Sequence, residues 1–141
     1  MALSSIAARL GDFFESRPEL PVVSAYLFGS HAEGRAHRES DVDVAVLLDW
    51  KACPHRGGRS ELRVTLTSEL IAALHHNEVD LVVLNDAPPL LGRRIVTEGR
   101  RVFCREPAAD HVYVRDVQLR AADLEPFIQR HRRRLLRRLA R

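Results

Sequence analysis

Three short runs of β-branched and aliphatic residues, separated by segments with helical spacing, set the strongest limit on what this chain can fold into. The runs cover residues 22–28, 41–48 and 79–84. Runs of this length, bounded by glycine, proline or polar residues, are typical of buried strands. Because strands that alternate with helices pack as a layered sandwich, we predict an α/β (α+β) fold with a small mixed β-sheet packed against helices.

Segments with helical spacing lie before and between these runs. Apolar side chains recur every three or four residues over 6–14 and over 62–74, so each segment can bury one face of a helix. A proline pair starts a shorter helix over 88–96, which Gly99 ends. Residues 101–104 are a candidate fourth strand.

Two other segments complete the predicted organisation. Residues 50–59 contain a proline and two adjacent glycines, which indicates a mobile loop. The C-terminal segment is helical, with Asp123 as the cap of a last helix and Pro126 in its first turn. A chain of 141 residues has room for one core. We therefore expect a core over 1–106 and, in the same domain, a helical extension over 107–141 that packs on it.

Positive charge is concentrated in the last twelve residues, which hold seven arginines and no acid. The whole chain carries +3, but removing these seven from the 22 basic residues leaves 15 against 19 acids, a net charge of −4 over residues 1–129. The body therefore lacks a generic basic surface, and we expect no nucleic acid partner. We interpret the arginine-rich helix as a solvated face, with docking on an acidic partner and phosphate contact as the alternatives. The seven are Arg130, Arg132, Arg133, Arg134, Arg137, Arg138 and Arg141.

The remaining composition places limits on location and on cysteine and histidine chemistry. No apolar run approaches the roughly 20 residues that cross a bilayer, and the N-terminus lacks the layout of a signal peptide, so we expect a cytoplasmic protein. Cys53 and Cys104 fit no metal spacing and are expected to be free thiols. The histidines, His31 among them, show no ligand spacing and are interpreted as surface residues. Trp50 is interpreted as hydrophobic cover.

Two aspartates at the start of the second strand are the first residues that point to chemistry. Asp41 and Asp43 lie two positions apart, so they share one face of the strand about 7 Å apart along the backbone. Two anions at that separation, beside a valine-rich strand, repel each other unless a proton or a cation lies between them. Oxygen ligands without a His or Cys partner favour Mg²⁺ or Mn²⁺ over zinc.

A third acid and a glycine turn extend the same argument. Asp80 interrupts a strand whose other residues belong in a core, and if that strand lies beside Asp41 and Asp43, three carboxylates meet at one sheet edge. Such a group can hold two metals roughly 3.5–4 Å apart. Gly29 and Ser30 end the first strand, where a residue without Cβ and a hydroxyl can hold phosphate oxygens. Together these parts suit phosphoryl or nucleotidyl transfer.

The order Gly29-Ser30, ten residues, then Asp41-Val42-Asp43 resembles the signature of the minimal nucleotidyltransferases, the smallest members of the DNA polymerase beta-like superfamily. The resemblance covers about residues 20–83, with Asp80 at the position of the third family carboxylate. Chain length and the downstream sequence VDLVVLNDAPPLLGRRIVTEGRRVF resemble the antitoxin branch, which is usually paired with a HEPN-domain RNase toxin. The resemblance implies a nucleotidyltransferase (polymerase beta-like) fold and Mg²⁺-dependent transfer of AMP from ATP to a tyrosine of the toxin.

The resemblance also implies a role for each site residue. Asp41, Asp43 and Asp80 would hold the metals, and Asp80 would also orient or deprotonate the attacking hydroxyl. Gly29 and Ser30 would bind the triphosphate. Glu33 stands where many relatives carry an arginine, and Arg35 or Arg38 would replace that positive charge. Two alternatives stay open: an antitoxin that neutralises its partner by binding alone, and a nucleotidyltransferase acting on a small molecule.

Overall fold

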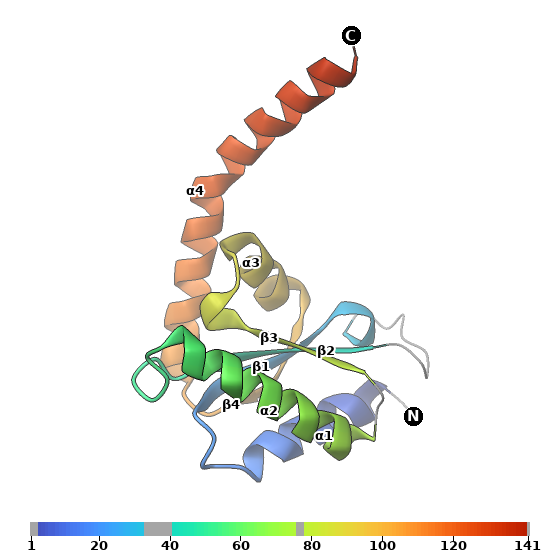
Figure 1. The fold of residues 1–141 in the computed structure, drawn as a ribbon, viewed down its shortest axis with the longest axis vertical. Helices are drawn as coiled ribbons and strands as arrows, with labels where there is room; N and C mark the ends of the chain where they lie inside the picture. Colours follow the sequence, from blue (N-terminus) through green and yellow to red (C-terminus); the bar gives the residue numbers. More distant parts are fainter. Residues whose placement is uncertain (1–2, 33–40, 76–77, 141) are drawn as a thin grey trace.

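The computed structural model describes residues 3–32, 41–75 and 78–140, which form a four-stranded mixed sheet between two layers of helices (Figure 1). The strand order is β3-β2-β1-β4, with β2 and β3 parallel and the other neighbours antiparallel. This arrangement confirms the predicted mixed α/β fold. The elements in chain order are α1 (Leu3–Glu15), β1 (Val22–Phe28), the 3-10 turn η1 (Gly29–His31), β2 (Val42–Leu48), α2 (Arg56–Leu74), β3 (Val79–Val83), the 3-10 turn η2 (Leu84–Asp86), α3 (Pro89–Glu98), β4 (Arg100–Cys104) and α4 (Pro107–Leu139).

The two faces of the sheet carry separate cores because side chains alternate along each strand. On one face Val44 of β2 packs with residues of α1 and α2, such as Leu10 and Leu70. On the other face Ala45 packs with Ile95 of α3 and, at the edge of the cluster, Tyr113 of α4. The predicted alternation along β2 is therefore confirmed, and it determines on which face Asp43 lies.

The start of α2 differs from the predicted loop. The turn covers residues 50–55, and the helix already begins at Arg56, so both glycines lie in its first turn. Arg59 is buried there and donates to Asp86 at 3.0 and 2.8 Å and to the carbonyl of Cys53 at 2.9 Å. These tertiary contacts hold the first turn in place and outweigh the low helix propensity of glycine.

The C-terminal segment also differs from the prediction, because α4 is one helix of 33 residues and Asp123 does not cap a separate one. Pro126 lies inside the helix, where it removes one backbone donor and favours a bend. The helix changes direction beyond the core (Figure 1). Only its first half packs on the core, through side chains that include Val117 and Ala121. Beyond Ala121 the large apolar side chains are exposed, including Phe127 at 65%, except for the partly buried Ile128.

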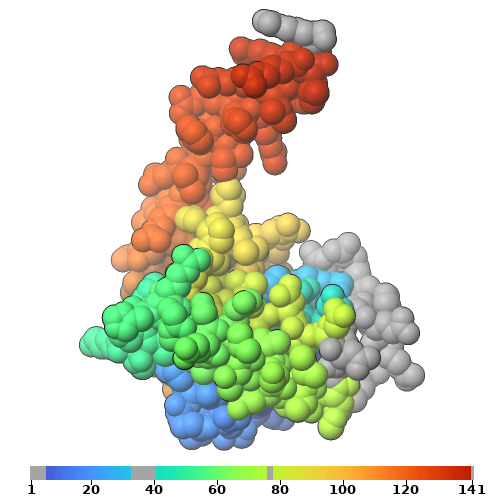
Figure 2. Space-filling view, in the orientation of Figure 1, coloured from blue at the N-terminus to red at the C-terminus, as the bar shows by residue number. Residues whose placement is uncertain are grey.

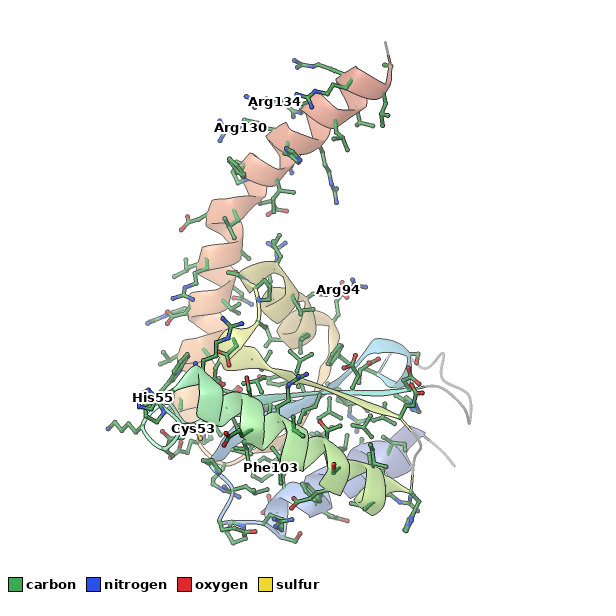
Figure 3. The ribbon with its side chains drawn as sticks, viewed as in Figure 1. Cys53, His55, Arg94, Phe103, Arg130 and Arg134 are labelled. Atoms are coloured by element: carbon green, nitrogen blue, oxygen red, sulfur yellow. The ribbon has the colours of Figure 1, made fainter. Side chains whose placement is uncertain are left out.

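The exposed half of α4 carries the arginine-rich segment away from the sheet. Arg130 and Arg134 extend from it without touching the core (Figure 3). The expectation that the whole extension packs on the core is therefore wrong for this half. Within the described ranges, none of the helices has both the length and the apolar character needed to span a membrane.

Candidate active site

The turn that follows β1 brings the backbone against Asp43. Gly29 has φ of 73°, in the left-handed region that favours glycine. A Cβ atom at this position would lie 2.2 Å from Oδ2 of Asp43, so any side chain here would collide with that carboxylate. Ser30 follows directly and is half-buried. The turn therefore holds its backbone against Asp43, and the expected contact of Gly29 and Ser30 with phosphate oxygens stays a prediction.

The parallel pairing of β2 and β3 places two of the predicted acids side by side. Asp43 is in register with Asp80, and neighbouring strands lie about 4.8 Å apart. Both residues lie on the sheet face of Ala45 and Val82, which α3 and α4 cover. The expected adjacency of their strands is confirmed. Asp41 lies directly before β2 and is exposed, as Asp80 is.

The electrostatics of Asp43 show that the three acids influence one another. Burial raises the pKa of Asp43, and the negative charges of Asp80 and then Asp41 raise it further, while His31 opposes this effect. Across residues 3–32, 41–75 and 78–140, no three Asp, Glu, His or Cys side chains form a ready-made metal cage. The acids are thus adjacent in register and coupled in charge.

His31 was interpreted from sequence as a surface residue, and the structure shows that this is wrong. Its side chain is only 7% exposed, and it lies in η1 close enough to Asp43 to affect the pKa of that carboxyl. The spacing of histidines could not reveal this, because His31 becomes buried through the tight turn at Gly29. Its position two residues after that glycine is the signal that sequence reasoning missed. Arg35, together with Glu33 and Arg38, lies outside the described residues.

A second group of buried polar residues ties α4 to the sheet, and sequence reasoning missed it as well. Asp110 is 3% exposed and accepts hydrogen bonds from Ser24 at 2.6 Å, Tyr26 at 2.7 Å and Arg101 at 3.0 Å. Burial and the hydrogen bond to Asp110 raise the pKa of Tyr26. Ser24 and Tyr26 lie more than 80 residues from Asp110 in sequence, so no local pattern signals the cluster. Its carboxylate is satisfied, and we assign it a structural role.

The end of β2 opposite the carboxylates borders a cavity of about 510 Å³. Its walls come from the end of β2, from η2 and from α4, with Trp50 and Arg120 among the lining side chains. Trp50 is 54% exposed and lies 5.0 Å from the guanidinium of Arg59, so it is not the hydrophobic cover expected from sequence. None of Asp41, Asp43 and Asp80 reaches this cavity, which is therefore separate from the acidic site.

A mixed sheet that presents neighbouring acids at one edge, beside a glycine turn, defines a nucleotidyltransferase-type site. Residues 9–108 match the family described as "Polymerase beta, Nucleotidyltransferase". The chain therefore belongs to the polymerase beta nucleotidyltransferase family.

Comparison with individual proteins agrees with this assignment. The chain is 38% identical over 90 residues to the protein adenylyltransferase MntA of Shewanella oneidensis, covering 61% of this chain and 55% of that protein. It thus spans about half the length of this curated relative.

Two solved structures of toxin–antitoxin complexes contain a chain with a similar fold. A chain from a toxin–antitoxin crystal structure with AMP-PNP is 25% identical, with a TM-score of 0.62, and the match covers 92% of this chain and 96% of that one. A chain from the complex of the tri-AMPylated HEPN toxin of Shewanella oneidensis with its MNT antitoxin is 22% identical, with a TM-score of 0.61 and 99% coverage of both chains. The second likeness supports the fold alone.

Proposed function

We propose that this protein is a Mg²⁺-dependent nucleotidyltransferase antitoxin that transfers AMP from ATP to a tyrosine hydroxyl of a HEPN-domain toxin and so neutralises it. The observation that carries the proposal is the position of Asp43, which lies in register with Asp80 and against the backbone of Gly29. A carboxylate held beside a second acid is poorly suited to a purely structural role, because burial and the neighbouring negative charges both disfavour its charged form.

The residues present fit a divalent metal and a triphosphate. The donors are carboxylate oxygens, which Mg²⁺ and Mn²⁺ prefer. Burial and then the negative charges of Asp80 and Asp41 raise the pKa of Asp43, and a bound cation would offset those charges. Because Gly29 has no Cβ, the backbone of the turn lies against Asp43, so phosphate oxygens bound at this turn would lie beside the carboxylates. We assign Asp41, Asp43 and Asp80 to metal binding and Gly29, Ser30 and Arg35 to the nucleotide.

The proposed reaction is displacement at the α-phosphorus of ATP. The tyrosine oxygen forms a bond to the α-phosphorus. At the same time the bond between that phosphorus and the oxygen bridging to the β-phosphate breaks, so pyrophosphate leaves and AMP remains on the acceptor. Asp80 accepts the phenolic proton on a carboxylate oxygen and orients the attacking hydroxyl. Bound Mg²⁺ would neutralise the charge on the phosphate oxygens. Ser30 would donate its hydroxyl proton to a phosphate oxygen.

The proposed acceptor and partner follow from the names of the relatives. MntA is described as a protein adenylyltransferase, and similar solved chains come from toxin–antitoxin complexes, one with AMP-PNP.

The test is to incubate the chain with its HEPN-domain partner, labelled ATP and Mg²⁺ and to look for AMP on the partner by mass spectrometry. We expect AMP on a tyrosine with the parent chain and none with the double variant Asp41→Ala, Asp43→Ala. Leaving out Mg²⁺ should also abolish transfer. If the double variant protects cells from the partner as well as the parent does, neutralisation does not depend on AMP transfer and the proposed function is wrong.

A further inference from the structure

The outer edge of β3 is open. Strand order places β3 at the end of the sheet, and in the part of the chain that the structure describes no strand lies beyond it. Val42 is in register with Val79, and its N–H donates to the carbonyl of Glu78. In a parallel pair this pattern directs the backbone N–H and C=O groups of residues 78, 80 and 82 toward β2. The backbone N–H and C=O groups of Val79, Leu81 and Val83 therefore face outward. Such an edge can accept another strand.

A groove of about 320 Å³ runs along this edge, between α2 on one side and the start of α3 on the other. In Figure 2 the yellow-green atoms of β3 reach the surface between the green helix α2 and the yellow helix α3. The groove is lined by residues 80–83 of β3, and by Pro88 and Leu91 near the start of α3. Asp80 lies in this groove and also beside Asp43, so the groove is continuous with the acidic site.

One side of α2 gives the groove a basic wall. Arg56, Ser60 and Arg63 stand at i, i+4 and i+7, so they project from the same side of the helix, and all three line the groove. Neither arginine forms an ion pair with a residue that the structure describes. Asp86 also lines the groove, but its charge is matched by Arg59 at 2.8 Å. The wall therefore complements negative charge, whereas Asp80 supplies the acid at the catalytic end.

We propose that the acceptor segment of the partner protein binds here as an extended strand added to β3, with acidic side chains against Arg56 and Arg63 and its tyrosine beside Asp80. Main-chain hydrogen bonds to Val79, Leu81 and Val83 would supply affinity, and the charged wall would supply selectivity. A residue paired across from this part of β3 lies within about 5.5 Å of it, which is the range needed to present a hydroxyl to the neighbouring carboxylate. This inference rests on the proposed function, because it names how the protein acceptor reaches the site.

Reversing the charge of the basic wall and measuring the kinetics of AMP transfer tests whether the wall selects the acceptor. In the double variant Arg56→Glu, Arg63→Glu we expect the KM for the HEPN-domain acceptor to rise about tenfold or more, with kcat and the KM for ATP within about twofold of the parent. Arg115→Glu, an exposed arginine of α4 that does not line the groove, is the matched control and should change none of the three. Equal acceptor KM in the folded double variant and in the parent would overturn the charged wall as a determinant.

Hydrogen exchange tests the added strand directly. When the acceptor binds, the outward amides of Val79, Leu81 and Val83 should exchange at least tenfold more slowly, because each gains a hydrogen bond. A complex that forms without added protection at these three amides, as it would if a helical surface docked instead, overturns the proposal.

Binding of a synthetic peptide tests the added strand independently of the proposed function. If the parent transfers no AMP to its partner, the proposed function fails. The groove is then tested with a short synthetic peptide that alternates Glu and Val around one Tyr. N-methylation of one alternate set of its amides should abolish protection of the β3 edge, and methylation of the other set should not. Absence of protection by the unmethylated peptide would overturn the added strand.

Discussion

The acids at the two ends of the sheet differ in how their charge is balanced. Near the start of α4, Asp110 is almost fully buried and has three hydrogen-bond donors, and beside η2 Asp86 forms an ion pair with the buried Arg59. At the other end Asp43 lies beside Asp80 and close to Asp41. The first group stabilises the fold, while the second concentrates negative charge that a ligand can neutralise.

This difference separates structural acids from functional ones more clearly than burial does. Asp110 is more buried than Asp43, yet it accepts hydrogen bonds from three side chains. The pKa of Asp86 is lowered, chiefly by its hydrogen bond to Arg59, whereas the pKa of Asp43 is raised by burial and by its acidic neighbours. Perturbed acids that lack a basic partner are therefore the better markers of an active site in this fold.

Replacing Asp43 tests the functional end and has the largest expected effect. In Asp43→Asn the rate of AMP transfer should fall by about 10³-fold, because one oxygen ligand with negative charge is lost from the site. The melting temperature should stay the same or rise, since repulsion from Asp80 and Asp41 is relieved. Calorimetry and a transfer assay on the same preparation measure both. A melting temperature that falls by several degrees would place Asp43 among the structural acids.

Replacing Asp110 should have the opposite profile. Asp110→Ala removes the acceptor of three hydrogen bonds, and we expect the free energy of unfolding to fall by about 3 kcal/mol. Chemical denaturation measures this loss. The AMP-transfer rate per folded molecule should remain within about twofold of the parent. A selective loss of transfer in a variant of parental stability would show that Asp110 serves the reaction and not the fold.

A methyl group at Gly29 tests how closely the turn must approach Asp43. In Gly29→Ala the new Cβ would meet Oδ2 of Asp43, and φ of 73° disfavours a side chain, so we expect a loss of about 1–2 kcal/mol in stability. Transfer activity should fall at the same time, because the carboxylate must move. Denaturation and transfer assays show whether both changes occur. Combining the change with Asp43→Gly, which removes the clash, should recover part of the stability but none of the activity.

The dependence of folding stability on pH should show a smaller effect, which has opposite signs for Asp86 and Asp43. The pKa of Asp86 lies below its ordinary 3.8, so its contribution is present above that value and is lost as pH falls through the lowered pKa. The pKa of Asp43 lies above 3.8, so the folded state gains stability as pH falls through that raised pKa. Stability measured from pH 6 to pH 3 should therefore decline less steeply in Asp86→Asn and more steeply in Asp43→Asn than in the parent.

Deleting residues 130–141 should have the smallest effect on the fold, because residues 130–140 are all exposed. We expect the melting temperature to change by less than about 2 °C. Partner binding should weaken more than ATP binding, as titration calorimetry with each ligand can show. Equal partner affinity in the truncated and the full-length chain would assign the arginines to a solvated face.

Local patterns predicted much of the fold and part of the site. The run over 22–28 coincides with β1, and period-two alternation correctly placed Asp43 on the face of Ala45 and Asp80 on the face of Val82. The pairing of β2 with β3 had to be assumed, since strand order depends on contacts between distant segments.

Other features could not be read locally. The burial of His31 depends on a backbone turn with positive φ at Gly29. The helical start of α2 depends on the contact of Arg59 with Asp86, which lies 27 residues away in the sequence. The uninterrupted course of α4 through Pro126 runs against the local signal altogether. In the first two cases a turn geometry or a tertiary contact, and not the residue pattern, decides the outcome.

The length of the exposed half of α4 separates its arginines electrostatically from the sheet. From Ala122 to Leu139 the helix extends about 27 Å at 1.5 Å per residue, whereas salt at 0.1 M attenuates fields between exposed charges beyond about 10 Å. Salt therefore screens the electrostatic interaction between the arginine cluster near the end of α4 and the carboxylates of the site. Substitutions that change the charge of this cluster should therefore have little electrostatic effect on the carboxylates at the sheet edge.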